Sequence, residues 1–278
     1  STFIGYEQES ELISALPENW QVITRNEEDF LVADSKVRTL IQDNQEVASA
    51  AAGTTLEVIL EPTPFYGESG GQIGDSGALF SKDGRLIGTV STTQKPVAGL
   101  HVSTIELHEA LEIGADVFAG YKPSDRYGIR AHHSATHLLH DALRNILGSH
   151  VQQAGSLVTR DRLRFDYSHF EAPSTEAISS VESEVNDVIQ AGHEVVTEVL
   201  PFDEAKAKGA LALFGEKYGD IVRVVTMGPS IEFCGGTHTK TTREIELCLV
   251  SRDEAIASGV RRIEAEVGNA AKARTVES

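Results

Sequence analysis

Two histidine-containing motifs stand far apart in this sequence, and a fold that uses both must bring them together. The first, His133-Ser-Ala-Thr-His137, places two histidines four residues apart. It lies at the start of an apolar run, residues 135–147, that predicts a helix, and residues four apart on a helix project from the same face. One metal ion can therefore bind both rings.

The second motif, Cys234-Gly-Gly-Thr-His238, has the same spacing but a different backbone. Its two central glycines favour a tight turn over a helix, and such a turn lets the cysteine and the histidine point inward. Imidazole and thiolate suit zinc better than magnesium or calcium, which prefer oxygen ligands. The two motifs together therefore predict a zinc site with four protein ligands.

Each of these residues also has a simpler interpretation. A histidine on a helix is more often a hydrogen-bonded core residue than a ligand. Cys234 has the alternative of being a small buried hydrophobe. We favour that alternative for Cys248, which lies in the apolar segment 245–250 and is predicted to be a strand residue.

Cysteine content and hydrophobicity indicate where such a chain works. Two cysteines in 278 residues cannot form a disulfide framework, and the N-terminal residues lack the order of a signal peptide. The apolar runs are far shorter than the roughly 20 residues that span a bilayer. We expect a soluble, cytoplasmic protein with no membrane partner, whose length and 40% hydrophobic content allow two cores.

The net charge of −18 argues against non-specific nucleic-acid binding, and we expect no DNA partner. Local charge differs from net charge, because arginines gather around the first motif and Arg261 and Arg262 follow the second. Any single arginine has the alternative of being an ordinary surface or ion-paired residue. The cluster beside a metal site favours a polyanionic substrate. Its members are Arg126, Arg130, Arg144, Arg160, Arg162 and Arg164.

The chain divides by texture into a β-rich part and a mixed part. Short β-rich segments at 31–33, 56–60, 86–90 and 115–119 alternate with turns and predict a small antiparallel barrel or sandwich. Beyond Pro123 the pattern is α+β. Helices are predicted from about 124 or 128 to 147, at 174–191 with Ser174 as N-cap and Gly192 at the end, and at 202–208. Strands are predicted at 155–158, 162–167, 194–200, 221–227, 245–250 and 260–267. We therefore expect a β-barrel-like domain at residues 1–125 and a zinc-binding α+β domain at 126–278.

The turn at residues 65–77 carries five glycines in thirteen residues. Such a loop allows close backbone approach and can present amide N–H groups to a ligand. It lacks the terminal Lys-Ser/Thr of a P-loop and does not fit a dinucleotide fingerprint. A bulged turn in the barrel is the alternative.

Seven segments together resemble one known family. They are residues 64–72, the helix 133–140, residues 147–157, the strand Arg162-Leu-Arg-Phe-Asp-Tyr-Ser-His169, Ala210-Leu-Ala-Leu-Phe-Gly-Glu-Lys-Tyr218, Cys-Gly-Gly-Thr-His238 and Gly259-Val-Arg-Arg-Ile-Glu264. They occur in this order in the editing region of bacterial-type alanyl-tRNA synthetase. The resemblance covers nearly the whole chain. The same core occurs in the free-standing alanyl-tRNA editing proteins called AlaX.

The resemblance implies a function and a set of site residues. The editing region, a zinc-containing domain like the second additional domain of threonyl- and alanyl-tRNA synthetases, removes wrongly attached serine or glycine from alanine tRNA by ester hydrolysis. It implies Zn²⁺ held by His133, His137, Cys234 and His238. It also implies an amino-acid pocket at Gln153 and Ser156, with Gly70, Gly71, Gln72 and Arg162 on the substrate side.

The sequence leaves the role of the zinc open. Zinc can lower the pKa of bound water to about 7 or polarise a carbonyl, but only at an open coordination position, and four protein ligands describe a closed site. Alternatively zinc orients the substrate while Gln153 and Thr136 position the water. Thr136 could equally bond its own helix backbone. Because an alanine pocket cannot exclude glycine or serine strongly, a second hydrolytic site is needed, and Ser156 and Gln153 are the candidates for binding the serine hydroxyl.

Two features depart from the family pattern or leave the setting open. His132 stands where we expect another residue, as a competing ligand or a partner of the ligands. Residues 241–246 lack the expected glycine. We expect an editing fragment of an alanine–tRNA ligase, since residues 3–7 resemble its join to the preceding domain, or a free-standing AlaX-type protein. Other classes are a non-catalytic, zinc-stabilised tRNA-binding module and a metallohydrolase of small esters.

Overall fold

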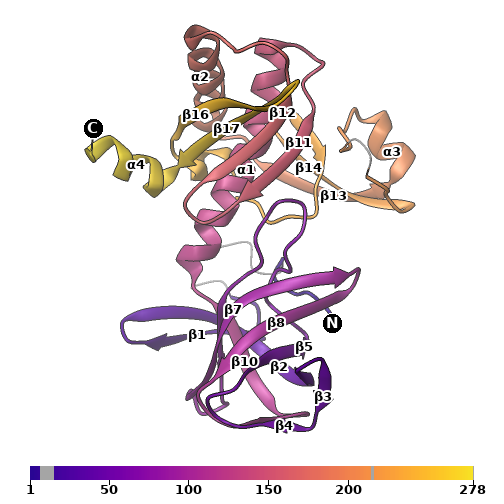
Figure 1. The fold of residues 1–278 in the computed structure, drawn as a ribbon, viewed down its shortest axis with the longest axis vertical. Helices are drawn as coiled ribbons and strands as arrows, with labels where there is room; N and C mark the ends of the chain where they lie inside the picture. Colours follow the sequence, from indigo (N-terminus) through magenta and orange to yellow (C-terminus); the bar gives the residue numbers. More distant parts are fainter. Residues whose placement is uncertain (7–15, 214–215, 278) are drawn as a thin grey trace. The chain divides into compact units, whose positions relative to one another are not determined.

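The computed structural model describes residues 1–6, 16–213 and 216–277 of the chain (Figure 1). Glu7 of the N-terminal segment and Phe214 and Gly215 of the 210–218 motif lie outside the described residues. The chain forms two compact units. The first comprises Ser1–Ser69 and Ile73–Arg126, and the second comprises Gly70–Gln72 and Tyr127–Ser278. Three residues of the glycine-rich loop thus belong to the second unit.

The first unit is built on a closed, six-stranded antiparallel barrel. Around the barrel the strand order is β2, β10, β6, β7, β8 and β5, and β5 pairs back with β2. Two further strands pair with β2, and a short ribbon of β4 and β9 lies apart from the barrel sheet. The barrel strands are β2 (Glu28–Gln42), β5 (Thr55–Glu61), β6 (Gly77–Phe80), β7 (Leu86–Val97), β8 (Leu100–Leu107) and β10 (Asp116–Tyr121), and the others are β1 (Trp20–Arg25), β3 (Gln45–Val47), β4 (Ser49–Ala50) and β9 (Leu111–Glu112).

Alternation of buried and exposed residues explains the barrel, and the predicted antiparallel barrel is confirmed. On β5, Leu56, Val58 and Leu60 are buried while the residues between them are more exposed, as expected for strands with one face inward. The strand predicted at 31–33 lies in the first half of the fifteen-residue strand β2. Its polar residues, such as Lys36 and Arg38, point outward and hid its length in the sequence.

The second unit packs helices against two antiparallel sheets (Figure 1). The first sheet has the order β11, β12, β17 and β16, and the second has the order β13, β14 and β15. Helix α1 begins in the last residues of the first unit and continues through the second. The elements are α1 (Pro123–Leu147), β11 (Gln153–Val158), β12 (Leu163–Ser168), α2 (Thr175–Ala191), β13 (Val195–Pro201), α3 (Phe202–Ala207), β14 (Ile221–Met227), β15 (Ser230–Phe233), a 3₁₀ turn η2 (Thr242–Ile245), β16 (Cys248–Ala257), β17 (Val260–Val267) and α4 (Gly268–Glu277).

A single core holds α1 against the first sheet and α2. It contains Ala135 and Leu139 from α1, Val185 from α2, Phe165 from β12 and Ile263 from β17, all of them fully buried. The face of α1 that presents these apolar residues is set by their helical spacing. This core fixes the part of α1 on which the first histidine motif stands.

The caps of α2 are confirmed, whereas one predicted strand begins too early. The hydroxyl oxygen of Ser174 accepts a hydrogen bond from the N–H of Ala177, and Gly192 ends the helix in the left-handed region at φ 67°. The strand predicted from residue 245 starts at Cys248, because Ile245 belongs to a 3₁₀ turn and Glu246 has φ 68°. Cys248 itself is a buried strand residue, as predicted.

Among the described residues, no helix has the length and apolar character needed to cross a membrane.

Candidate metal centre

The structure brings the two histidine motifs to one point of the second unit. His133 and His137 come from α1, and Cys234 and His238 come from the turn after β15. One ligand atom from each side chain lies within 4.8 Å of all the others. The Nε2 atoms of His137 and His238 are 3.1 Å apart, and the Sγ of Cys234 lies 3.4 Å from Nε2 of His133 and 3.5 Å from Nε2 of His238.

These distances fit a tetrahedral ion. Zinc–nitrogen bonds of about 2.05 Å and a zinc–sulfur bond of about 2.3 Å at tetrahedral angles put ligand nitrogens about 3.3 Å apart, and nitrogen and sulfur about 3.6 Å apart. The one nitrogen–nitrogen distance and the two nitrogen–sulfur distances given above are close to these values. The four side chains therefore form a cluster that could bind a metal, with the donor set of a closed site.

The turn that carries Cys234 is held by Arg223 of β14. Nη1 of Arg223 donates to the carbonyl oxygen of Cys234 at 2.9 Å and to that of Gly236 at 2.8 Å. Gly236 also faces a histidine of the cluster, because a Cβ atom there would lie 2.0 Å from Cε1 of His133. The turn is thus fixed by the half-buried Arg223 guanidinium on its carbonyl oxygens and by the close approach of a histidine ring.

A buried carboxylate orients the second histidine of the helix. One oxygen of Glu232, on β15, lies 3.3 Å from Nδ1 of His137, and the other lies 2.9 Å from Nδ1 of His140. A carboxylate on one imidazole nitrogen directs the other nitrogen toward a metal. Burial opposes ionisation of Glu232, but His137 and His140 outweigh it and lower its pKa to about 2.

The electrostatics of the cluster favour a cation. Burial alone would raise the pKa of the Cys234 thiol, but His133, His238 and His137 hold it well below its usual value and favour the thiolate. Burial would lower the pKa of His137, yet Glu232 and Cys234 raise it to about 10. By contrast, burial and the neighbouring His133 lower the pKa of His238 to about 3, although Cys234 acts in the opposite direction. The buried Glu232 carboxylate and the partly buried Cys234 thiolate therefore attract positive charge to this point.

Two polar residues of α1 have their hydrogen bonds elsewhere. Nδ1 of His132 lies 2.8 Å from the carbonyl oxygen of Gly128. Nε2 of His132 accepts a hydrogen bond from the backbone N–H of Val267 at 3.1 Å. Both ring nitrogens are therefore engaged outside the cluster, and His132 supports the packing of α1 on β17. The Thr136 hydroxyl donates to the carbonyl oxygen of His132 at 2.8 Å, which is the backbone contact raised as the alternative to a role with water.

The predicted pocket residues lie on and beside β11. Gln153 and Ser156 are half-buried members of this strand. Gly71 lies against it, since its carbonyl oxygen accepts the N–H of Val158 at 2.7 Å and a Cβ atom on it would be 2.7 Å from the Ser156 carbonyl oxygen. Gly70 and Gly71 have φ of 58° and 85°, which the glycines permit. Gln72 is fully buried next to His133.

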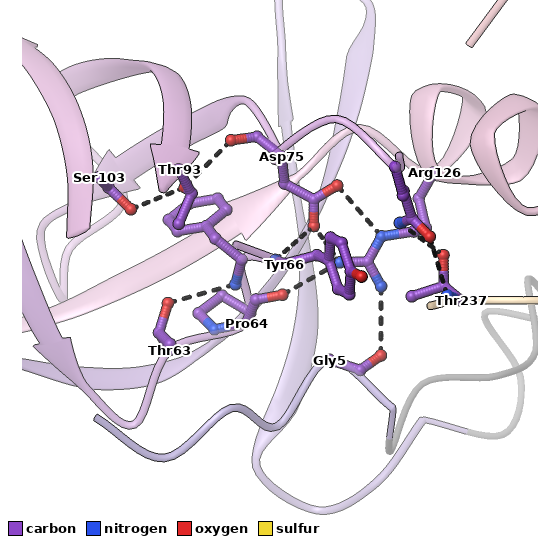
Figure 2. Close-up of polar contacts among 11 residues, drawn as sticks. Gly5, Thr63, Pro64, Tyr66, Asp75, Thr93, Ser103, Arg126 and Thr237 are labelled. Atoms are coloured by element: carbon purple, nitrogen blue, oxygen red, sulfur yellow. Dashed lines mark hydrogen bonds and ion pairs between the residues drawn. The ribbon is translucent and has the colours of Figure 1, made fainter. Parts of the chain in front are cut away.

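The predicted arginine cluster is not one free basic surface. Arg126 is buried in the first unit, where it pairs with Asp75 and donates to two backbone carbonyl oxygens (Figure 2). Arg144 donates to the Val151 carbonyl oxygen at 2.7 Å, and Arg262 pairs with Asp166. The Arg162 side chain is exposed.

Sequence reasoning missed Glu232, Arg223 and the hydrogen bonds of Gln72. Glu232 stands two residues before the second motif, but acidic residues are common in this chain and nothing in the spacing sets it apart. Arg223 carries no local signal, because its partners are backbone carbonyl oxygens. Both could be found only once the strands were paired.

Comparisons with known proteins match both units. Residues 6–123 match the family model described as tRNA synthetases class II (A), and residues 222–264 match the threonyl and alanyl tRNA synthetase second additional domain. That second match contains Cys234 and His238.

Similar proteins include three named alanine–tRNA ligase. The one from Bradyrhizobium diazoefficiens is 48% identical over 254 residues, covering 86% of this chain and 28% of the relative. The one from Acidithiobacillus ferridurans is 51% identical over 237 residues, covering 84% of this chain and 27% of the relative. The one from Myxococcus xanthus is 46% identical over 237 residues, covering 84% of this chain and 26% of the relative. The chain thus spans about a quarter of the length of the curated relatives it matches.

Proposed function

The chain belongs to the alanine–tRNA ligase family, of whose members it matches one segment, and on this premise we propose that it edits mischarged alanine tRNA. The reaction is hydrolysis of the ester that links serine or glycine to the tRNA 3′ end. The main support is the cluster of His133, His137, Cys234 and His238, part of which lies in the segment that matches the second additional domain.

The four cluster residues would hold a zinc ion. Such an ion supplies Lewis-acid polarisation of a carbonyl oxygen, or a more acidic water, where a coordination position is open. Glu232 keeps Nε2 of His137 directed at the cluster, and Arg223 holds the Cys234 turn in place. The chain's own contribution at this point is to fix four donors in advance, so that little reorganisation accompanies binding.

We assign the water and substrate contacts to polar groups of α1, the glycine-rich loop and the segment 153–162. We assign Gln153 to positioning the water, with Thr136 restricted to accepting a hydrogen bond, because its proton is donated to its own helix. Ser156 would bind the hydroxyl of a serine substrate. Gly70 and Gly71 offer backbone N–H groups, and exposed Arg162 suits a tRNA phosphate. A pocket that rewards the serine hydroxyl spares alanine.

Deacylation of charged tRNA tests the proposal. The purified chain is incubated with alanine tRNA charged with serine, with glycine or, as control, with alanine, and bound zinc is measured in parallel. We expect loss of serine or glycine with alanine spared. Cys234→Ala should lose both zinc and deacylation. Cys248→Ala changes the other cysteine, which lies in β16 outside the cluster, and should keep both.

One observation favours a second candidate, a non-catalytic zinc-stabilised tRNA-binding module. The cluster offers four protein donors, the number that fills a tetrahedral zinc shell. Zinc and tRNA bound without deacylation would support this module. Hydrolysis of small esters without tRNA would instead indicate a general metallohydrolase. We further propose that the protein is cytoplasmic. It would act either as the editing part of a synthetase or as a free-standing AlaX-type protein.

A further inference from the structure

We propose that Gln72, in the glycine-rich loop, is a positioning residue of the metal centre that sets the proton location and orientation of His133. The inference rests on the proposed metal site and not on the deacylation reaction. Gln72 is fully buried although it lies 61 positions before His133, in a loop whose neighbours belong to the other unit. A buried side-chain amide must find hydrogen-bond partners, and these partners determine what it does.

Thr237 fixes which way the amide of Gln72 points. The backbone N–H of Thr237 lies 2.9 Å from Oε1 of Gln72, and the Thr237 hydroxyl oxygen lies 2.9 Å from Nε2. A backbone N–H can only donate, so the amide atom that faces it is the oxygen. The reversed amide would place two donors against each other. The orientation therefore follows from the backbone of the Cys234–His238 turn.

The amide oxygen in turn fixes the tautomer of His133. Oε1 of Gln72 lies 2.8 Å from Nδ1 of His133, and an amide oxygen only accepts. Nδ1 therefore carries the proton, and Nε2, 3.4 Å from the Cys234 sulfur, presents its lone pair to the cluster. Gln72 does for His133 what Glu232 does for His137. Both helix histidines then direct Nε2 toward the cluster.

Close backbone approach on both sides of Gln72 makes this geometry specific. Gly71 lies so near β11 that a Cβ atom would meet the backbone of Ser156. On the other side, a Cβ atom at Gly236 would lie 2.4 Å from Nδ1 of His133 and 2.9 Å from Oε1 of Gln72. The hydrogen bond between Gln72 and His133 thus runs through a space that only glycine at position 236 leaves open.

Seating of the loop and binding of the metal are therefore linked. A loop that places Gln72 raises metal affinity, and by thermodynamic reciprocity a bound metal holds the loop in place. The glycine-rich loop accordingly acts on the site from outside the ligand set, through a ring nitrogen that the metal does not use.

Metal affinity of matched variants tests the role of Gln72. Gln72→Met keeps the side-chain length but removes the acceptor, and should weaken zinc binding by about 10- to 100-fold. Gln72→Glu keeps an oxygen toward both N–H groups and should retain most of the affinity. Gln45→Met changes an exposed glutamine of β3 and should bind zinc as the parent does. Zinc affinity is measured by chelator competition, and the visible absorption of the cobalt form reports tetrahedral geometry.

Two results would overturn the proposal. One is Gln72→Met with parental zinc affinity. The other is Gln72→Glu that binds as weakly as Gln72→Met, since the acceptor would then be irrelevant. If Gln72→Met does not fold, ¹⁵N NMR of the zinc-loaded parent decides: a proton on Nδ1 of His133 is expected, and metal on Nδ1 contradicts the assignment. Zinc bound in this way without deacylation would refute the editing function and leave this inference standing.

Discussion

Gly235 and Gly236 are neighbours of the same type in the same turn, yet only one of them lies against a histidine of the cluster. A Cβ atom on Gly235 would meet nothing within 4 Å, whereas one on Gly236 would overlap the His133 ring. Neither glycine lies in the left-handed region, so backbone strain does not separate them. The difference between the two positions is therefore purely steric.

This pair gives a prediction with its own control. Gly236→Ala should displace His133 from the cluster and reduce zinc retention by at least about 10-fold, because the ring is a rigid group that cannot yield like the end of a flexible side chain. Gly235→Ala should bind zinc normally. Zinc content after dialysis against a weak chelator measures both. Equal retention by the two variants would show that the turn relaxes around the added methyl group.

The sequence identified the four cluster side chains but not the residues that orient them. Histidine and cysteine at short fixed spacings indicate a possible metal site from the local sequence alone, so His133 and Cys234 could be identified in advance. Glu232, Gln72 and His132 could not be assigned, because each role depends on a partner from a distant segment. For His132 the partner is a backbone N–H on β17, which no side-chain pattern reveals.

At the scale of the element, the glycine-rich loop is held at its base by a buried ion pair (Figure 2). The Arg126 guanidinium pairs with Asp75 and donates to the carbonyl oxygens of Gly5 at 3.2 Å and Pro64 at 3.1 Å. Asp75 also accepts the N–H of Tyr66 at 2.8 Å. Burial opposes the charge of Arg126, but Asp75 raises its pKa above the ordinary value. One arginine thus joins both ends of the loop.

Breaking this pair should destabilise the barrel strongly. Asp75→Ala leaves Arg126 buried without its counter-ion and should cost about 3–5 kcal/mol in the free energy of unfolding. Asp116→Ala removes the exposed partner of Lys36 and should change it by about 0–1 kcal/mol. The single tryptophan, Trp20, lies in the barrel core, so its fluorescence in urea reports this unit. Comparable losses in the two variants would refute a special role for the buried pair.

Elements were predictable where a local signal marks their ends. Helix α2 begins at Ser174 and stops at Gly192, and both signals are single residues. The strand expected from residue 245 failed at its start, because the apolar alternation continues through a 3₁₀ turn whose Ile245 is buried. Alternation reports burial on one side and does not by itself distinguish a strand from a tight turn.

At the scale of the whole molecule, all members of the metal cluster belong to the second unit. The barrel class was predictable from short β-rich segments and turns. The closure of the barrel was not predictable, because it depends on the pairing of β5 with β2, and the sequence of neither strand indicates its partner. The assignment of Gly70–Gln72 to the second unit likewise depends on distant contacts.

Removal of the metal should therefore affect the two units differently. A ligand that binds only the folded second unit stabilises it by about 4 kcal/mol at a free concentration of 1,000 times its dissociation constant. Chelation should speed amide hydrogen exchange in α1 and β11–β17 and at Gly70–Gln72, because their folded state loses that binding energy. The urea midpoint reported by Trp20 should stay unchanged, since none of the four cluster residues belongs to the barrel core. A midpoint that fell together with protection in the second unit would mean that the two units unfold as one.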